Sequence, residues 1–278
     1  MIDVAIDSHD NTVFAAAMQV PGGSIKFPPP KPPIPPSVDF GGGAVAFTWS
    51  LVELDANGQF VFDADASFAG ANGPSGPVSL TTDSTGRIWS AGSESGSQSG
   101  SPAIAAFDAS GHPLWVQSVS APDGYGNPWQ PMVRVDANDE AFTTAGWSQL
   151  PASGNWLDEP LLYKFSASGA PSWTPPAAIP QDAWGQLDQS SASWWGAPWS
   201  GGRLAVEPSG SALVSTAFAG TADFGSAGKL TSAGGFDSAV LRFDAQGHLI
   251  GGARWGGADD EFPVDVAVDA AGDGVIAG

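Results

Sequence analysis

The stretch RLAVEPSGSALVSTAFAGTADFGSAGKLTSAGGFDSAVLRFDAQGHLIGGARW, from Arg203 to Trp255, decides the fold. It contains four short runs with apolar residues at alternate positions: Leu204–Val206, Ala212–Ala217, Ser238–Phe243 and His248–Arg254. Runs of this length and period, closed by Gly and Asp turns, predict antiparallel strands joined by hairpins. Four such strands form one small sheet, which cannot bury both faces alone and therefore needs copies of itself.

Two motifs show that the copies are present along the whole chain. The first is an apolar strand followed by an acid and a turn, and its acids are Asp7, Asp83, Asp136, Glu207 and Asp269. The second is a strand, a tight turn with glycine and another strand, and its glycines are Gly58, Gly111, Gly169 and Gly247. The motifs alternate strictly, and the acids of the first recur about every 50 to 75 residues, which is typical of blade repeats with loop insertions. The pattern predicts an all-β fold, a β-propeller of four-stranded antiparallel blades with four full repeats and a half repeat.

The blades and the segments between them divide the chain into one continuous array, residues 1–278. Its blades are expected at about 3–68, 78–119, 132–173 and 203–255, with a half-blade at 264–278. Long insertions occupy 19–37, which is rich in proline, and 92–102, 147–159 and 174–201. In an up-and-down sheet these insertions share one end and the short turns share the other, and function in repeat proteins collects where insertions collect. Because four and a half repeats do not close a ring, the array is expected to belong to a larger ring, with further blades or another chain at its open edge.

Composition narrows the class of partner. The formal net charge is −20, with 9 Lys and Arg against 29 Asp and Glu. This disfavours nucleic acids and anionic membranes, which are bound by basic patches. The absence of cysteine excludes disulfides and thiol chemistry. No apolar run predicts membrane insertion, and MIDVAIDSHD lacks the features of a signal peptide, so a signal segment of an exported protein is expected outside this chain.

Several segments resemble a known repeat. VAVDAAGDGVIAG, VDFGGG, TADFGSAGKLTSAGGFDSAVLRFDAQGH and ARWGG are similar to the bacterial SBBP-type β-propeller repeat. The match is strong over residues 203–278, moderate in the first blade and weak in the second and third, where Asp-Phe-Gly is absent. The resemblance implies the propeller fold and an extracellular or cell-surface setting. It implies no reaction, because a fold with many uses fixes no function.

The turn acids are the first candidate site, because carboxylates near turns could bind calcium. The competing interpretation is that each Asp begins a turn by bonding to the backbone two residues further on. Their separation between blades and the lack of a calcium-loop spacing favour the turn interpretation. The weak metal candidates are the densest oxygen cluster, Asp136, Asn138, Asp139 and Glu140. No other cofactor is expected.

The tryptophans and acids of the insertions are the second candidate site. Exposed Trp is suited to sugar rings and protein partners, although loops also use Trp to form their own small cores. Carboxylates beside Trp could bind sugar hydroxyls or act as a glycosidase pair, although solvated surface charge is the commoner role. The candidate ligand-binding residues are Trp147, Trp156, Trp184, Trp194, Trp195, Trp199, Asp158, Glu159, Asp182 and Asp188.

Catalytic motifs find little support in the sequence. Gly96–Gly100 superficially resembles a nucleophile elbow, but its central residue is Gln98 and it lies in a low-complexity loop. The three His have no metal-ligand spacing, and no glycine-rich phosphate loop precedes a helix. We therefore expect no catalytic residues and a non-enzymatic extracytoplasmic scaffold that binds a protein partner or surface component through its loops. The alternatives are a carbohydrate-binding or glycan-processing propeller and a structural subunit of a larger surface assembly or filament.

Overall fold

The computed structural model describes residues 3–17, 38–39, 44–45, 49–65, 77–93, 102–119, 125–149, 157–173, 177–178, 203–269 and 271–278. These residues form β-strands and turns, with a single 3₁₀ turn at Gly225–Ala227. No helix among them could cross a membrane. The expectation of an all-β protein is confirmed.

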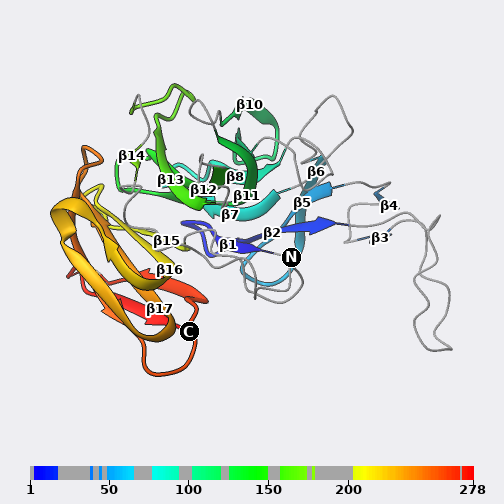
Figure 1. Ribbon diagram of the computed structural model, residues 1–278. Helices are drawn as coiled ribbons and strands as arrows, with labels where there is room; N and C mark the ends of the chain where they lie inside the picture. Colours follow the sequence, from blue (N-terminus) through cyan, green and yellow to red (C-terminus); the bar gives the residue numbers. More distant parts are fainter. Residues whose placement is uncertain are drawn as a thin grey trace, which may run out of the picture.

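Four antiparallel sheets of four strands each follow one another along the chain (Figure 1). The first is β1 (Val4–Ile6), β2 (Thr12–Ala17), β5 (Trp49–Leu54) and β6 (Phe60–Asp65). The second is β7 (Pro77–Thr82), β8 (Ile88–Ser93), β9 (Pro102–Phe107) and β10 (Pro113–Ser118). The third is β11 (Tyr125–Val135), β12 (Ala141–Gln149), β13 (Leu157–Phe165) and β14 (Ala177–Ala178). The fourth is β15 (Arg203–Val206), β16 (Ala212–Asp223), β17 (Lys229–Phe243) and β18 (Leu249–Trp255).

Two smaller sheets complete the fold. A fifth, two-stranded sheet consists of β19 (Asp265–Val268) and β20 (Gly274–Ala277). A short hairpin of β3 (Val38–Asp39) and β4 (Ala44–Val45) lies between β2 and β5 along the chain. In every four-stranded sheet the strands lie side by side in sequence order, as the alternating motifs predict.

The first strands of successive sheets contact one another. β1 packs on β7, β7 on β11, β11 on β15 and β15 on β19. Figure 1 shows β1, β7, β11 and β15 toward the middle of the molecule, with the later strands of each sheet further out. An up-and-down sheet that is entered from the middle and repeated in this way is a propeller-like arrangement.

Apolar residues between neighbouring sheets form the core. Phe142 and Leu162 of the third sheet cluster with Leu204, Phe218 and Leu241 of the fourth. Three similar clusters join the first sheet to the second, the second to the third and the fourth to the fifth. Because burial of each large apolar side chain contributes about 1.5–3 kcal/mol, each sheet is stabilised mainly by its neighbours.

Every hairpin turn at one end of the sheets has the same construction. The N–H of its first residue donates to the carbonyl of the fifth, and the N–H of the fourth donates to the carbonyl of the first. The fourth residue adopts positive φ, so it is Gly in seven of the turns, while Asp10 (φ 61°) and Asp139 (φ 59°) take that place in two. These nine described turns begin at Asp7, Asp55, Asp83, Asp108, Asp136, Ser166, Glu207, Asp244 and Asp269. We call this end of the molecule the turn end.

Strands continue into three segments that the sequence pattern assigns to insertions. β8 runs to Ser93 and β9 begins at Pro102, so they enter the two ends of the range 92–102. β12 runs to Gln149 and β13 begins at Leu157, so both enter the range 147–159. The fourth strand of the third sheet is Ala177–Ala178, within 174–201, whereas Pro171 forms only an isolated bridge with Phe165. Alternating apolar residues mark only the half-buried part of a strand, so polar extensions of a hairpin escape the pattern.

Candidate functional site

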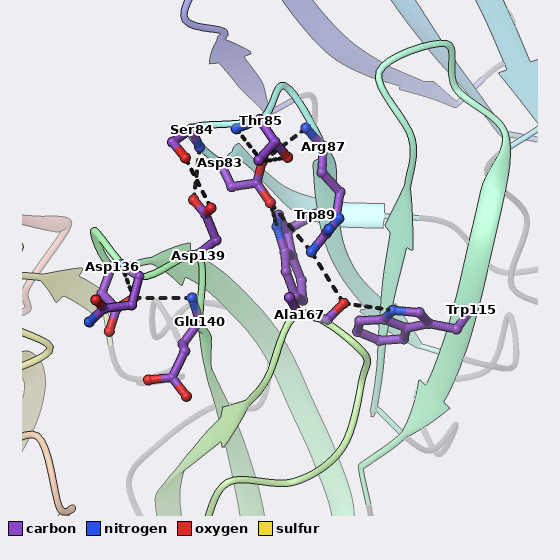
Figure 2. A network of polar contacts seen from close by, with 11 residues as sticks. Asp83, Ser84, Thr85, Arg87, Trp89, Trp115, Asp136, Asp139, Glu140 and Ala167 are labelled. Atoms are coloured by element: carbon purple, nitrogen blue, oxygen red, sulfur yellow. Dashed lines mark hydrogen bonds and ion pairs between the residues drawn. The ribbon is translucent and has the colours of Figure 1, made fainter.

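The turn acid of the second sheet, Asp83, is buried, and both of its carboxylate oxygens have hydrogen-bond partners (Figure 2). Its Oδ1 accepts hydrogen bonds from the backbone N–H groups of Thr85 (2.9 Å) and Arg87 (3.0 Å). Its Oδ2 accepts one from Nε1 of Trp89 (3.0 Å), and the Arg87 guanidinium lies 3.6 Å away. The carboxylate therefore closes its own turn with one oxygen and anchors a core tryptophan with the other.

In the third sheet the equivalent acid, Asp136, meets a cation from the third strand. Its Oδ1 accepts from the backbone N–H groups of Asn138 and Glu140. Its Oδ2 lies 3.6 Å from Nζ of Lys164, which also forms an ion pair of 2.7 Å with Glu140. The ammonium is buried and lies 4.7 Å from the ring centroid of Phe142, where a cation–π contact adds to its stabilisation.

In the remaining complete sheets the turn acid also lies close to a charged residue of the third strand. In the fourth sheet Glu207 and Arg242 form an ion pair of 2.6 Å. In the first sheet the third strand supplies an acid instead, Glu53, and Asn11 bridges it to Asp7 by donating Nδ2 to both carboxylates (2.8 and 3.1 Å). Burial raises the pKa of Glu53, the negative charge of Asp7 raises it further, and the hydrogen bond from Asn11 opposes the shift.

Contacts between sheets also use the turn end. The carbonyl of Ala167 in the third sheet accepts hydrogen bonds from Arg87 (3.2 Å) and Trp115 (3.3 Å) of the second, as Figure 2 shows. Asp139 of the third sheet accepts from the backbone N–H and the hydroxyl of Ser84, both at 2.9 Å. The polar groups of this end therefore join neighbouring sheets to one another.

The structure separates the candidate metal ligands. Asp136 and Glu140 face Lys164, Asp139 faces Ser84 in the neighbouring sheet, and Asn138 is exposed. Among the described residues no three His, Asp or Glu side chains come together in a way that could hold a metal ion. The interpretation of the turn aspartates as backbone-bonding groups is confirmed, because Oδ1 of Asp7, Asp83, Asp136 and Asp269 accepts from the backbone two and four residues further on.

Three of the candidate ligand-binding residues lie on strands. Trp147 of β12 is paired in register with Glu159 of β13, and Ser148 is paired with Asp158. The tryptophan and one carboxylate are thus register neighbours at the end of the hairpin opposite the turn end. The other candidates, Trp156, Trp184, Trp194, Trp195, Trp199, Asp182 and Asp188, lie outside the described residues.

The described part of the end opposite the turns holds the buried acid Asp237. Its Oδ2 accepts the backbone N–H of Ala233 (3.1 Å) and forms an ion pair with Arg254. Nearby, Asp260 accepts the backbone N–H of Phe236 (2.9 Å) and Glu261 accepts that of Gly257 (2.8 Å). The Asp260 bond ties the segment 256–262 to β17, whereas the Glu261 bond lies within that segment.

Sequence reasoning missed the third-strand position that faces each turn acid. It is occupied by Glu53, Ala106, Lys164 and Arg242, each two residues before the first residue of the second turn. A charged residue inside an otherwise apolar strand was the available signal, since a buried charge requires a partner.

No protein-family model matches the chain, and no curated protein matches it. Among solved structures, the chain is similar to a protein of unknown function from Dyadobacter fermentans DSM 18053. That match has 11% identity and a TM-score of 0.49, and it covers 97% of this chain and 69% of the other. The chain is also similar to the endo-arabinase from Bacteroides thetaiotaomicron VPI-5482, with 10% identity and a TM-score of 0.49 over 99% of this chain and 87% of the other.

Proposed function

We propose that the protein is a non-enzymatic, extracytoplasmic β-propeller scaffold that binds a protein partner or surface component through the end opposite its turns. The observation that carries the proposal is the difference between the two ends. At the turn end the charged side chains described above serve the turns and the contacts between sheets. The sequence pattern assigns the long insertions to the opposite end, and surface loops on a rigid scaffold are where repeat proteins place recognition.

Two further features support the proposal. The resemblance of residues 203–278 to the SBBP-type repeat favours a cell-surface setting of a bacterial protein. A net charge of −20 keeps such a surface protein soluble and favours a partner with cationic groups.

Binding of the labelled full chain to intact bacterial cells tests this function. Replacing residues 182–199 by a Gly-Ser linker of equal length is expected to weaken cell binding at least tenfold. The matched control is His112→Ala, because His112 is an exposed residue of the turn end. Equal loss in both variants, or undiminished binding of the linker variant, would contradict the proposal.

One observation favours a second candidate, a carbohydrate-binding propeller. Trp147 and Glu159 are register neighbours on adjacent strands, and Trp and Glu are residue types suited to a sugar ring and its hydroxyls. On a glycan array, Trp147→Ala and Glu159→Gln are each expected to reduce the signal of any bound glycan, while Trp255→Ala is expected to leave it unchanged. Absence of binding to every glycan would exclude this candidate.

A further inference from the structure

Three hairpin turns of the turn end begin with Asp-Ala and differ in the two residues that follow. Residues 55–58 end in Asn-Gly, residues 136–139 in Asn-Asp and residues 244–247 in Gln-Gly. In each turn the N–H of the third residue donates to Oδ1 of the aspartate at 2.9 Å. The N–H of the fourth residue donates to the aspartate carbonyl, at 2.8, 3.1 and 3.0 Å respectively. The three turns therefore share one pattern of backbone hydrogen bonds and provide an internal comparison of three sequences.

The Asn-Gly sequence of the first of these turns is chemically labile. The backbone nitrogen of Gly58 can attack Cγ of the Asn57 side chain and close a five-membered succinimide ring. Glycine favours this reaction because it has no Cβ to shield its nitrogen and because it reaches backbone conformations that other residues avoid. The Asn-Asp turn lacks that advantage, and Gln246 would have to close a less favourable six-membered ring. Among the described residues no other asparagine is followed by glycine.

The reaction needs only water. The bond from the Gly58 nitrogen to Cγ forms as the bond from Cγ to Nδ2 breaks. The amide proton of Gly58 passes to the solvent, and the side-chain nitrogen takes up a proton and leaves as ammonia. Water then opens the ring. Cleavage between the Gly58 nitrogen and Cγ gives aspartate at position 57, whereas cleavage between this nitrogen and the backbone carbonyl carbon gives isoaspartate, in which the chain runs through Cβ and Cγ.

The surroundings of Asn57 leave this reaction open. Asn57 and Gly58 are both exposed, and a Cβ at Gly58 would meet nothing within 4 Å. The turn at residues 136–139 is held more firmly, because Asp139 accepts hydrogen bonds from the backbone N–H and the hydroxyl of Ser84, both at 2.9 Å. Ring closure requires the Gly58 N–H to leave the Asp55 carbonyl, and an exposed turn opens more readily than the buried strands.

Isoaspartate at position 57 would disturb the turn in two ways. It adds one carbon to the backbone between Asp55 and Gln59, and the 2.8 Å hydrogen bond from the Asp55 N–H to the Gln59 carbonyl closes this turn. It also places a second carboxylate beside Asp55. A hydrogen bond from the backbone N–H of Gln59 lowers the pKa of Asp55, and hydrogen bonds from the backbone and side chain of Asn57 lower it further. The Asp55 carboxylate is therefore charged at neutral pH and would repel the new one.

The turn leads into the outermost strand of the first sheet. Within the described part of the chain β6 is hydrogen-bonded to β5 alone. Phe62 of β6 packs against the cluster that joins the first and second sheets, and a Cβ added at Gly111 of the second sheet would meet its ring. A change at Asn57 therefore reaches the pairing of β5 with β6 and, through Phe62, an interface between sheets.

We propose that Asn57 is a site of spontaneous deamidation and that its isoaspartyl product loosens β6. The exposed Asn-Gly sequence supplies the reactive atoms, and the added backbone carbon supplies the effect on the strand. The site lies at the turn end, so this inference does not rest on the function proposed above.

Ageing of the purified full chain at mildly alkaline pH tests the proposal. Peptide mapping by mass spectrometry, with electron-transfer fragmentation to distinguish isoaspartate from aspartate, measures conversion at Asn57 and Asn138 separately. Asn72, which also precedes a glycine but lies outside the described residues, is quantified as a third site. We expect Asn57 to convert about tenfold faster than Asn138, with isoaspartate as the main product.

Two variants copy the sequences of the other two turns, so each variant turn already exists in this fold. Gly58→Asp gives the sequence of residues 136–139, where Asp139 adopts a φ of 59°, and it should slow conversion of Asn57 about tenfold. Asn57→Gln gives the sequence of residues 244–247 and should stay unmodified at this position. Ageing should accelerate hydrogen exchange of the β6 amides in the wild type and leave it unchanged in Asn57→Gln, which keeps Asn72.

Two results for the reaction would overturn the proposal: conversion of Asn57 no faster than that of Asn138, or equal rates in the wild type and Gly58→Asp. Two results for the strand would also overturn it. The first is unchanged exchange of β6 in an aged sample that carries isoaspartate at position 57. The second is equal acceleration of exchange in the wild type and Asn57→Gln.

Discussion

The third-strand residue opposite the turn acid differs from sheet to sheet, and the partner of the acid differs with it. Lys164 and Arg242 supply a positive charge, Trp89 supplies an indole N–H where the third strand has Ala106, and Glu53 supplies a second carboxylate bridged by Asn11. The backbone of the turn is the same in all four sheets. The four sheets therefore have the same turn geometry, but the residue type at the third-strand position differs. The effect of a substitution at that position depends on the sheet.

Replacing the buried ammonium is expected to be costly. Lys164→Met keeps the volume of the stem but leaves the buried carboxylate of Asp136 without its cation, and breaking a buried ion pair costs about 3–5 kcal/mol. Lys229→Met is the matched control, because the Lys229–Asp223 pair of 3.5 Å is largely exposed and contributes at most about 1 kcal/mol. Urea unfolding of the two variants measures the difference. A loss at Lys164 no larger than that at Lys229 would show that water reaches Asp136.

Glu53 gives the protein a pH dependence of predictable sign. Because burial raises the pKa of Glu53, the native state holds this proton at a pH where the unfolded chain has released it. Its contribution to the free energy of unfolding is greatest below the ordinary glutamate pKa and falls as the pH rises through the raised pKa. Glu53→Gln keeps an acceptor for Asn11, so the variant should lose less stability than the wild type between pH 4 and pH 7 in thermal unfolding.

The turn aspartate Asp108 serves as a control, because its contribution to stability changes with pH in the opposite direction. A hydrogen bond from the backbone N–H of His112 lowers the pKa of Asp108, so its contribution is present above the ordinary aspartate pKa and is lost as the pH falls through the lowered value. Asp108→Asn should therefore change the acid limb of the profile and leave the range from pH 5 to pH 7 unaltered. A Glu53→Gln profile parallel to that of the wild type would refute the assignment.

At the scale of the hairpin, a turn glycine can serve two purposes, a backbone conformation and a close contact between sheets. Gly169 and Gly58 both adopt positive φ, at 84° and 76°, which most side chains adopt only with strain. A Cβ at Gly169 would also lie 2.8 Å from the ring of Trp115 in the neighbouring sheet, whereas one at Gly58 would meet nothing within 4 Å. Gly58 meets a conformational requirement alone, whereas Gly169 also allows a close contact between sheets.

Substituting these two glycines by alanine therefore separates the cost of backbone strain from the cost of overpacking. Gly58→Ala should cost about 1–2 kcal/mol through backbone strain alone. Gly169→Ala should cost about 1–3 kcal/mol more, because the added methyl group overpacks the interface with Trp115. Chemical denaturation of both variants checks the difference. Equal losses would mean that the Trp115 ring moves aside freely.

The hairpins also show which parts of the fold can be predicted from sequence. Turn residues at fixed spacing indicate the nine described turns and the order of strands, because the Asp and Gly requirements of these turns are local. The extensions of β12 and β13 escape the pattern, since they carry polar and proline residues around Pro160 and a period-two signal needs one buried face. The pairing of Asp136 with Lys164 and of Glu207 with Arg242 escaped the prediction, because it depends on which third-strand residue the register places opposite.

For the whole molecule, the excess of 29 acidic over 9 basic residues acts as a distributed repulsion. Screening this repulsion stabilises the compact state, and the Debye length falls from about 30 Å at 0.01 M to about 3 Å at 1 M salt. The Tm is therefore expected to rise between 10 mM and 500 mM NaCl at pH 7. The rise should shrink at pH 4, where carboxylates begin to gain protons. A Tm that falls with salt would mean that ion pairs such as Arg242–Glu207 outweigh the net repulsion.

Each sheet packs on the one before and the one after it, and this has a consequence for cooperativity. When every unit is stabilised mainly by its two neighbours, the array behaves as a linear chain of coupled elements rather than as one block. An internal unit such as the third sheet can open only by giving up its interfaces with both the second and the fourth sheets. Opening of one sheet should therefore weaken the sheets on either side of it, so that native-state hydrogen exchange spreads from sheet to sheet rather than through the whole array at once.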